Sequence, residues 1–480
     1  MNNYSLIKGK NMAIVQKIKY NSDNQYFAGF LQDIIDKSEI KGSVNFKNNV
    51  ITLVLNEKDS KALAKFSELS NKYLPHSIFL DTINTIVEDT IIDTSKFHSN
   101  KYNIAPCAQC LEELVNPSSS YYLDDSYVCK HYSNTDVIFD NDSTFFTPHY
   151  TDGCAVLVAD TSKIDDLFIM TQKEKEVLFS IEKPTIKVTI KDEELKSLTN
   201  KIYINIKAPY NVRSTLFALN AKDSEIPYIF FQDTNDLKVI KVQENTTIIR
   251  STRIAKKLIK LDEDSSINRF LNIANEANFK NIAIGANLSY TNGINFIVKT
   301  EVGTNKVIQF QDFNLEQVLR QMKTDEIRVK LLENFVNKYP NVMENLENNS
   351  YNLFEALCII LGLENYSFEI LSDKALEFRG NGGLKVDIDF IEDGVDYSSL
   401  IGSVMSFILA GADTHYIAYS IFEAFGDMAI ATLNQLKKKF KIDNIIMMGD
   451  MFENSVLYSR ILSKYQLSNP YFSKSIALDD

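Results

Sequence analysis

The chain has 480 residues, more than one hydrophobic core usually organises, so its length predicts about two to four domains. Lysine and arginine number 51 against 63 acidic residues, and the resulting net charge of −12 disfavours nucleic acid and anionic membranes as partners. Only 16 glycines are present, fewer than half the average share, which argues against abundant phosphate-cradling loops.

The 5 cysteines are few and odd in number, and the first twenty residues or so hold no uninterrupted apolar stretch typical of a secretory leader. The longest apolar run, 353–363, contains Glu355 and is too short to cross a bilayer. We therefore expect a cytoplasmic protein with reduced thiols and no membrane contact.

Strand and helix patterns alternate at the start of the chain. Apolar and β-branched residues at 13–19, 50–55 and 78–87 predict strands, and helical spacing at 26–38 and 58–73 predicts two helices. A β-α-β-β-α-β order in fewer than about a hundred residues is typical of a ferredoxin-like α+β sandwich.

A polar, loop-rich stretch follows and holds three cysteines with the spacing Cys107-x2-Cys110-x18-Cys129. The first pair suits a knuckle that places two thiolates on one tetrahedral metal, and a second knuckle would supply the other ligands. This second knuckle would begin at Cys129 and end with a cysteine at position 132, but that residue is Tyr132. The nearest residue that could replace the missing ligand is His131. These three cysteines and His131 are the candidate zinc ligands; the alternative is a relic finger whose thiols only pack in a core.

Short strand patterns continue to about residue 261, and helical patterns dominate the remainder. The first group predicts an open mixed sheet with interleaved helices. Two more cysteines, Cys154 and Cys358, lie in apolar surroundings and are expected to be buried packing residues. The predicted strands are 154–160, 185–190, 201–206, 227–231, 246–250, 281–286, 295–299 and 444–448, and the later helices are 353–363, 397–409 and 417–438.

Five motif-bearing segments follow one another along the chain: Ile104–Pro117 (IAPCAQCLEELVNP), Asn205–Leu219 (NIKAPYNVRSTLFAL), Thr247–Leu261 (TIIRSTRIAKKLIKL), Asn352–Leu363 (NLFEALCIILGL) and Asn444–Asn454 (NIIMMGDMFEN). In this order they resemble motifs of the HypF family, the carbamoyltransferases of nickel–iron hydrogenase maturation. The first is similar to the opening of that family's zinc finger, and the last to its "VVLSGGVFQN" segment. The chain thus resembles a divergent, shortened HypF homologue.

The resemblance implies an α+β and α/β multidomain fold in four parts. Residues 1–92 correspond to an acylphosphatase-like domain and 93–150 to a degenerate zinc-finger-like module. Residues 151–262 correspond to a YrdC-like domain and 263–480 to a shortened, actin-like (RNase H-like) carbamoyltransferase domain. In the family, carbamoyl phosphate is hydrolysed, the carbamate is adenylated with ATP, and the carbamoyl group passes to the C-terminal cysteine of the partner HypE.

The residues that acylphosphatase chemistry needs are replaced here. An arginine and a backbone cradle would hold the phosphate, but the corresponding segment Asn21–Phe30 contains no arginine. The water-positioning asparagine falls on Phe46, and Asn45 lies one position away, on the opposite face of a strand. These replacements imply that the acylphosphatase site expected from the resemblance has lost its activity.

The adenylation site of the YrdC-like part is also altered. Its small-residue turn falls on 231–235, where Asp233 would place a carboxylate near the phosphates. Arg213, Arg250 and Arg253 remain as the basic candidates for nucleotide binding. The alternative is that all three are solvated surface charges.

The transferase part lacks the paired histidines of the family. Its one histidine, His415, stands after a helix-start pattern. The family's metal-binding aspartate falls on Ser473. Its nucleotide loop is reduced to Met448-Gly449-Asp450, which leaves Gly449 as a candidate and adds a negative charge beside it.

Two further motifs have open interpretations. The glycine-rich box 379–383 is either an anion-binding turn or the tip of a hairpin between 375–378 and 384–390. The run 387–393 is either a hard-cation site or a solvated strand edge and turn. Its acidic residues are Asp387, Asp389, Glu392 and Asp393.

Three hypotheses follow for function. The first is a catalytically degenerate HypF-like protein, a pseudoenzyme that binds HypE or another hydrogenase maturation protein. The second is a divergent active carbamoyltransferase that uses carbamoyl phosphate and ATP. The third is a structural protein that reuses these domains. Zinc is the candidate cofactor, with the relic finger as the alternative, and ATP and carbamoyl phosphate are expected only in the second.

Overall fold

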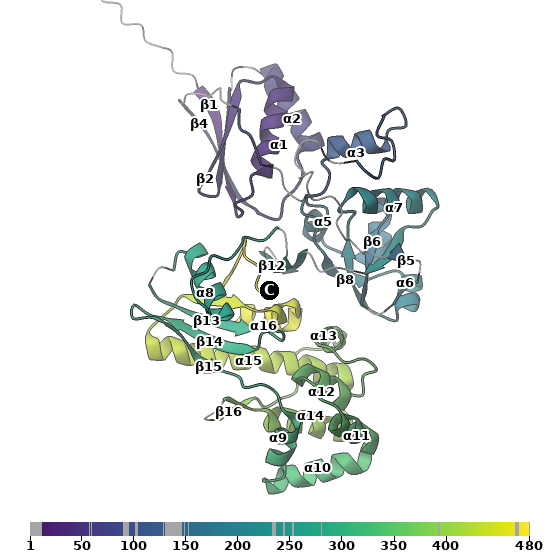
Figure 1. Ribbon diagram of the computed structural model, residues 1–480, viewed down its shortest axis with the longest axis vertical. Helices are drawn as coiled ribbons and strands as arrows, with labels where there is room; N and C mark the ends of the chain where they lie inside the picture. Colours follow the sequence, from purple (N-terminus) through teal and green to yellow (C-terminus); the bar gives the residue numbers. More distant parts are fainter. Residues whose placement is uncertain are drawn as a thin grey trace, which may run out of the picture. The chain divides into compact units, whose positions relative to one another are not determined.

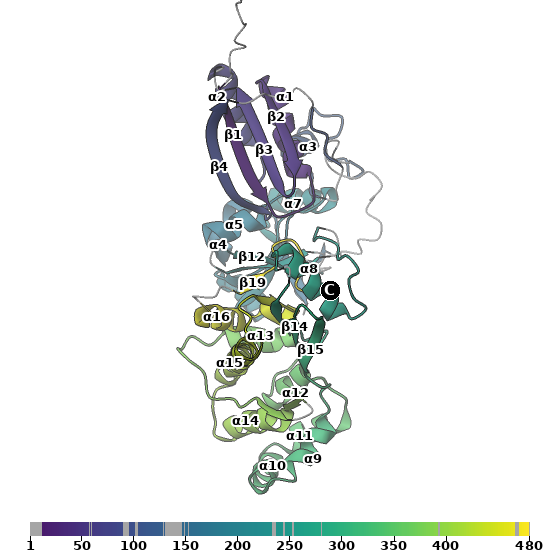
Figure 2. The same ribbon diagram turned by 90° about the vertical axis from the view of Figure 1, so that its left-hand side faces the viewer.

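The computed structural model describes residues 12–479, except 57, 59, 90–95, 101–103, 128, 130–145, 148, 152, 233–236, 243–244, 252–253, 280, 392–393 and 466–469. The chain divides into two compact units (Figures 1 and 2). The first unit comprises residues 1–241 and 251–256, and the second comprises 242–250 and 257–480. Each unit is a mixed α+β structure with sheets of its own.

The first unit begins with a four-stranded antiparallel sheet in the order β2-β3-β1-β4. Helices α1 and α2 pack on one face of it (Figure 1), and α1 buries Phe27, Phe30 and Ile34 because apolar residues recur at helical spacing. The predicted β-α-β-β-α-β order is present. The bounds are β1 (Met12–Tyr20), α1 (Tyr26–Ser38), β2 (Gly42–Lys47), β3 (Val50–Asn56), α2 (Ser60–Tyr73) and β4 (Leu80–Asp89).

After α3 (Ala108–Val115) comes a six-stranded mixed sheet in the order β5-β10-β6-β9-β8-β7, in which β6 and β9 are parallel. Helix α7 covers one face, where Ala218 and Phe231 share a core with Leu157. The predicted mixed sheet is therefore present. Its strands are β5 (Phe146–Thr147), β6 (Cys154–Val158), β7 (Phe168–Ile169), β8 (Ile186–Ile190), β9 (Tyr203–Lys207) and β10 (Tyr228–Gln232), followed by β11 (Leu237–Val242); the helices are η1 (Thr161–Lys163), α4 (Ile164–Leu167), α5 (Gln172–Leu178), α6 (Glu193–Thr199) and α7 (Val212–Asp223).

The second unit contains a five-stranded sheet in the order β15-β14-β13-β18-β19. Strands β13, β18 and β19 are parallel, and β14 and β15 complete an antiparallel meander. Phe270 of α8 packs against Gly285 of β13, where a Cβ atom would lie 2.5 Å from the ring. The bounds are β12 (Asn245–Ser251), α8 (Ser265–Glu276), β13 (Ala283–Leu288), β14 (Ile294–Lys299), β15 (Thr304–Gln309), β18 (Ile445–Met448), η2 (Asp450–Glu453), α16 (Ser455–Lys464) and β19 (Tyr471–Phe472).

Between β15 and β18 the second unit is mainly helical, and α15 packs along α13 and α16 (Figure 1). The predicted helix 397–409 has the same bounds as α14, and the helix predicted at 417–438 lies within α15. The bounds are α9 (Leu315–Met322), α10 (Glu326–Lys338), α11 (Pro340–Asn348), α12 (Leu353–Ile360), α13 (Phe368–Leu376), β16 (Asp389–Ile391), β17 (Gly394–Asp396), α14 (Tyr397–Leu409) and α15 (Thr414–Phe440).

The hairpin predicted at the glycine-rich box is wrong. Residues 375–376 end helix α13, 384–388 form no strand, and the hairpin of this region is β16–β17 instead. The Gly383 N–H donates to the Glu423 carboxylate at 2.5 Å, and the Leu384 N–H donates to the Ser420 hydroxyl at 2.8 Å. The box is thus fixed to helix α15, and Glu423 already fills the position of a bound anion at Gly383.

Candidate functional site

The three clustered cysteines come together in the first unit. Cys107 precedes α3, Cys110 lies in its first turn, and Cys129 returns to them; all three are buried. Their sulfur atoms lie within 4.8 Å of one another, and the Sγ atoms of Cys107 and Cys129 are 3.8 Å apart. Zn–S bonds of about 2.3 Å in a tetrahedron place two sulfurs about 3.8 Å apart, whereas a disulfide needs about 2.05 Å. The spacing therefore fits three ligands of one metal ion.

The remaining cysteine predictions have different outcomes. The candidate fourth ligand His131 lies outside the described residues. Cys154 in β6 and Cys358 in α12 are buried, as predicted for packing residues. Burial raises the pKa of Cys358 to about 11, which keeps this thiol protonated and unreactive at neutral pH.

The loop between β1 and α1 uses its polar groups within the chain. The Asn21 N–H donates to the Phe79 carbonyl at 2.8 Å, and the Asn24 N–H donates to the Ser22 hydroxyl at 3.1 Å. On β2, Asn45 is exposed, while Phe46 faces the Tyr20 ring. A phosphate would find neither an arginine nor these N–H groups available in this loop.

The basic residues predicted for the mixed sheet are dispersed. Arg213 lies exposed in the first turn of α7, and Arg253 lies outside the described residues, as does the turn residue Asp233. Two lysines that the sequence analysis missed are partly or fully buried instead. Lys183 is partly buried before β8, where burial lowers its pKa to about 8, and Lys207 is fully buried in β9, 4.2 Å from the centre of the Tyr210 ring. Lys207 stands between Ile206 and Ala208 at the end of a strand pattern, which is the signal that could have identified it. Lys183 follows Glu182 and carries no such signal.

Arg250 and Gly449 belong to one buried cluster in the second unit. The Arg250 guanidinium donates to the Asp450 carboxylate at 2.7 Å and to the Tyr290 hydroxyl at 2.6 Å. The same carboxylate accepts from the Tyr290 N–H at 2.8 Å and from the Thr291 hydroxyl at 2.5 Å. We call Arg250, Tyr290, Thr291, Asp450 and Asp479 the Asp450 network. Burial, followed by the charge of Asp479, raises the pKa of Asp450.

The backbone N–H groups of Gly449 and Asp450 also have hydrogen-bond acceptors within the chain. The Gly449 N–H donates to the Leu478 carbonyl at 2.9 Å, and the Asp450 N–H donates to the Asp479 carboxylate at 3.2 Å. Gly449 has φ 110, and a Cβ atom would lie 2.2 Å from the Leu288 carbonyl oxygen. Packing alone therefore requires glycine at this position.

These contacts lie where open α/β sheets usually bind ligands. Asp450 follows parallel strand β18, and Tyr290 and Thr291 follow its parallel neighbour β13. Ligands bind in such sheets at the carboxyl ends of parallel strands, where N–H groups and loops converge. In this chain two carboxylates of its own, Asp450 and Asp479, accept those hydrogen bonds.

The other predicted metal positions are engaged as well. The Ser473 hydroxyl donates to Glu276 at 2.6 Å. Asp387 pairs with Lys385 at 3.1 Å, and Asp389 accepts from the Ser399 hydroxyl at 2.9 Å. The remaining acids of that run, Glu392 and Asp393, lie outside the described residues.

Comparison with solved structures identifies the architecture. A full-length HypF in its phosphate- and nucleotide-bound form superposes with a TM-score of 0.57, covering 98% of this chain and 97% of that one. The HypF of T. kodakarensis gives a TM-score of 0.62 over the same shares. The chain has the HypF fold. Sequence identity to either structure is 12%, so the likeness concerns the fold.

Sequence comparison adds one curated protein that is similar to this chain. Protein HydE of Wolinella succinogenes is 22% identical over 342 residues, which cover 63% of this chain and 62% of that protein. The match thus spans less than two thirds of the relative's length. No protein-family model matches the chain. Among the described residues, none of the helices has the length and apolar character needed to cross a membrane.

Proposed function

We propose that this protein is a catalytically degenerate HypF-like protein that acts by binding a hydrogenase maturation protein, HypE or another. The Asp450 network carries the proposal. It fills the carboxyl ends of β13 and β18 with two carboxylates of the chain. A triphosphate brought there would meet negative charges and N–H groups that already have acceptors, so its binding is disfavoured.

The loops of the first unit support the same conclusion. The β1–α1 loop lacks an arginine, and the lysine that reaches it, Lys256, pairs with the loop's own Asp23 at 3.1 Å. The charge of this lysine is therefore already offset by a carboxylate. Removing one group that stabilises a transition state usually costs about 100-fold to 1,000-fold in rate. Losses in two regions of the fold are therefore expected to abolish the multi-step reaction.

The test is ATP-dependent carbamoyl transfer from labelled carbamoyl phosphate to purified HypE, with an authentic HypF as positive control. We expect no transfer above background and no measurable heat of ATP binding. Co-purification with HypE or another maturation protein is expected in the same preparation. Turnover near that of the control would support instead the alternative, a divergent active carbamoyltransferase that uses carbamoyl phosphate and ATP.

We further propose a structural zinc ion held by Cys107, Cys110 and Cys129, with His131 as the candidate fourth ligand. The sulfur spacing described above supports it, and zinc here would tie α3 to the chain at Cys129. Metal analysis should find about one zinc per chain in the parent protein, and none in Cys107→Ser. Cys358→Ser, which removes a buried thiol elsewhere, is the control and should keep its zinc.

A further inference from the structure

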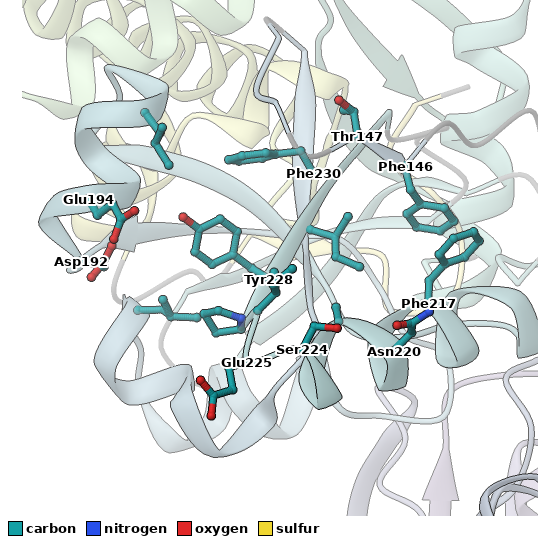
Figure 3. Close-up of a pocket in the computed structure, with 16 residues that line it drawn as sticks. Phe146, Thr147, Asp192, Glu194, Phe217, Asn220, Ser224, Glu225, Tyr228 and Phe230 are labelled. Carbon is teal, nitrogen blue, oxygen red and sulfur yellow. The ribbon is translucent and has the colours of Figure 1, made fainter.

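A hollow of about 680 Å³ opens in the first unit beside the start of β10 (Figure 3). Aromatic side chains form much of its wall. The rings of Phe146 and Phe217 lie 4.6 Å apart between centroids, and those of Tyr228 and Phe230 lie 5.5 Å apart. The volume is within the range of about 300–1,000 Å³ that ligand-binding clefts usually show.

Three carboxylates border this hollow, which we call the acidic hollow. Asp192 and Glu194 come from the start of α6, and Glu225 follows α7. Figure 3 places Asp192 and Glu194 on one side of Tyr228, and Phe146 and Phe217 on the other. No described lining residue is a lysine or arginine. A phosphate or carboxylate ligand would therefore be repelled, and a cation attracted.

The carboxylates of Glu194 and Glu225 are available to a ligand, whereas Asp192 caps helix α6 by accepting from the Leu195 N–H at 2.7 Å. Within the described part of the chain, no salt bridge joins Glu194 or Glu225 to a cation, whereas the adjacent Glu193 pairs with Lys196 at 2.6 Å. Burial raises the pKa of Tyr228, and the charges of Glu194 and then Asp192 add to the effect. The negative field thus reaches the middle of the aromatic wall.

The rim of the hollow is apolar and only half covered. Leu198 is 54% exposed, Phe217 44% and Ile226 49%. Apolar side chains gathered around a concavity, and left half in water, are typical of protein-binding surfaces. A small molecule inside the hollow would leave this rim exposed, whereas a peptide segment would cover it.

We propose that the acidic hollow binds an exposed segment of a partner protein that carries an arginine or lysine between apolar residues. The cation lies near Glu194 and Glu225, and the apolar flank lies against Phe146 and Phe217. The proposal rests on the proposed binding function and specifies the chemistry of the partner. It adds a recognition site that the HypF-like chemistry does not require.

The test is fluorescence anisotropy of the full chain with a labelled peptide, acetyl-Phe-Gly-Arg-Leu-amide, at low and high salt. We expect saturable binding that weakens with salt and is lost when the arginine of the peptide is replaced by glutamate. Glu194→Lys and Glu225→Lys should each weaken binding by roughly tenfold or more. Glu193→Lys, one residue away on the same helix but outside the hollow, should change it less than about twofold.

Three results would overturn the site. They are no binding of the peptide to the parent chain, equal weakening by Glu193→Lys and Glu194→Lys, and equally tight binding of free phenethylammonium, which would indicate a small-molecule pocket. The outcome is separable from the proposed function. If the chain transfers carbamoyl groups and also binds the peptide through Glu194, only the proposed loss of catalysis is refuted. If it neither transfers carbamoyl groups nor binds the peptide, only the proposed peptide site is refuted.

Discussion

The two groups of carboxylates in this chain contrast sharply. In the Asp450 network, Asp450 is completely buried, and Arg250, Tyr290 and Thr291 of the same unit donate hydrogen bonds to its carboxylate. In the acidic hollow, Glu194 and Glu225 face a cavity, and no described cation pairs with them. The same functional group is thus structural where donors enclose it and available for recognition where they do not.

The contrast follows from the cost of burying charge. A carboxylate removed from water needs several hydrogen-bond donors to replace its hydration. When one of these donors is removed, the folded protein loses a large part of the free energy that stabilised the buried charge. A carboxylate at the edge of an open cavity keeps its water until a partner displaces it. Mutation should therefore lower stability in the Asp450 network, and should lower peptide binding with little change in stability in the acidic hollow.

The largest effect is expected from Arg250→Met, which leaves Asp450 buried without its cation. We expect the unfolding free energy of the second unit to fall by about 3–5 kcal/mol. Urea denaturation followed by fluorescence measures this loss. The double variant Arg250→Met/Asp450→Asn should recover part of it, because the neutral amide no longer needs the guanidinium. A double variant as unstable as the single one would show that packing, and not the charge, dominates.

The next effect concerns a partnered carboxylate in the first unit. Glu182 is buried and accepts from the Tyr26 hydroxyl at 2.7 Å, the Ser77 hydroxyl at 2.5 Å and the Ile78 N–H at 3.0 Å. In Glu182→Gln an amide NH2 must face one of these donors, so we expect a loss of about 1–3 kcal/mol. Thermal denaturation at pH 7 measures it. An unchanged midpoint would mean that the three donors can reorient or reach water.

How much of this could be predicted depended on the range of the interactions involved. Helix α1 and helix α14 have the bounds that the apolar spacing predicted, because a helix is specified by residues three and four apart. The hairpin at the glycine-rich box failed because its turn signal is local. Glu423, 40 positions later, takes the Gly383 N–H and holds the segment on α15.

The candidate sites show the same limit. The spacing of Cys107 and Cys110 is a local motif, and the fold brings Cys129 to them. Asp450 was interpreted only as a charge that disturbs a nucleotide loop. Its ion pair with Arg250 joins residues 200 positions apart, which no window of sequence contains. The acidic hollow was missed because its wall comes from segments between Phe146 and Phe230 that carry no common motif.

A pH-dependent effect is expected at Lys183, a partly buried lysine whose charged form is disfavoured by burial. Burial lowers its pKa to about 8 in the folded state, below the 10.5 of an exposed lysine. The unfolded chain therefore holds the proton more tightly, and the parent protein gains stability as pH rises from about 8 to about 10.5. Lys183→Met lacks this gain. Melting temperatures across pH 7–10.5 should show the parent rising relative to the variant, and parallel curves would contradict the lowered pKa.

The smallest effect is expected from Glu194→Gln in the acidic hollow. Because no described cation pairs with this carboxylate, its neutralisation should change the unfolding free energy by no more than about 0.5 kcal/mol. The same variant should weaken the labelled peptide severalfold, so that binding and stability separate. Glu193→Gln, which removes an exposed pair with Lys196, should be equally neutral in stability and should leave peptide binding unchanged. A marked loss of stability in Glu194→Gln would show that this carboxylate has a structural partner, and the contrast with Asp450 would then fail.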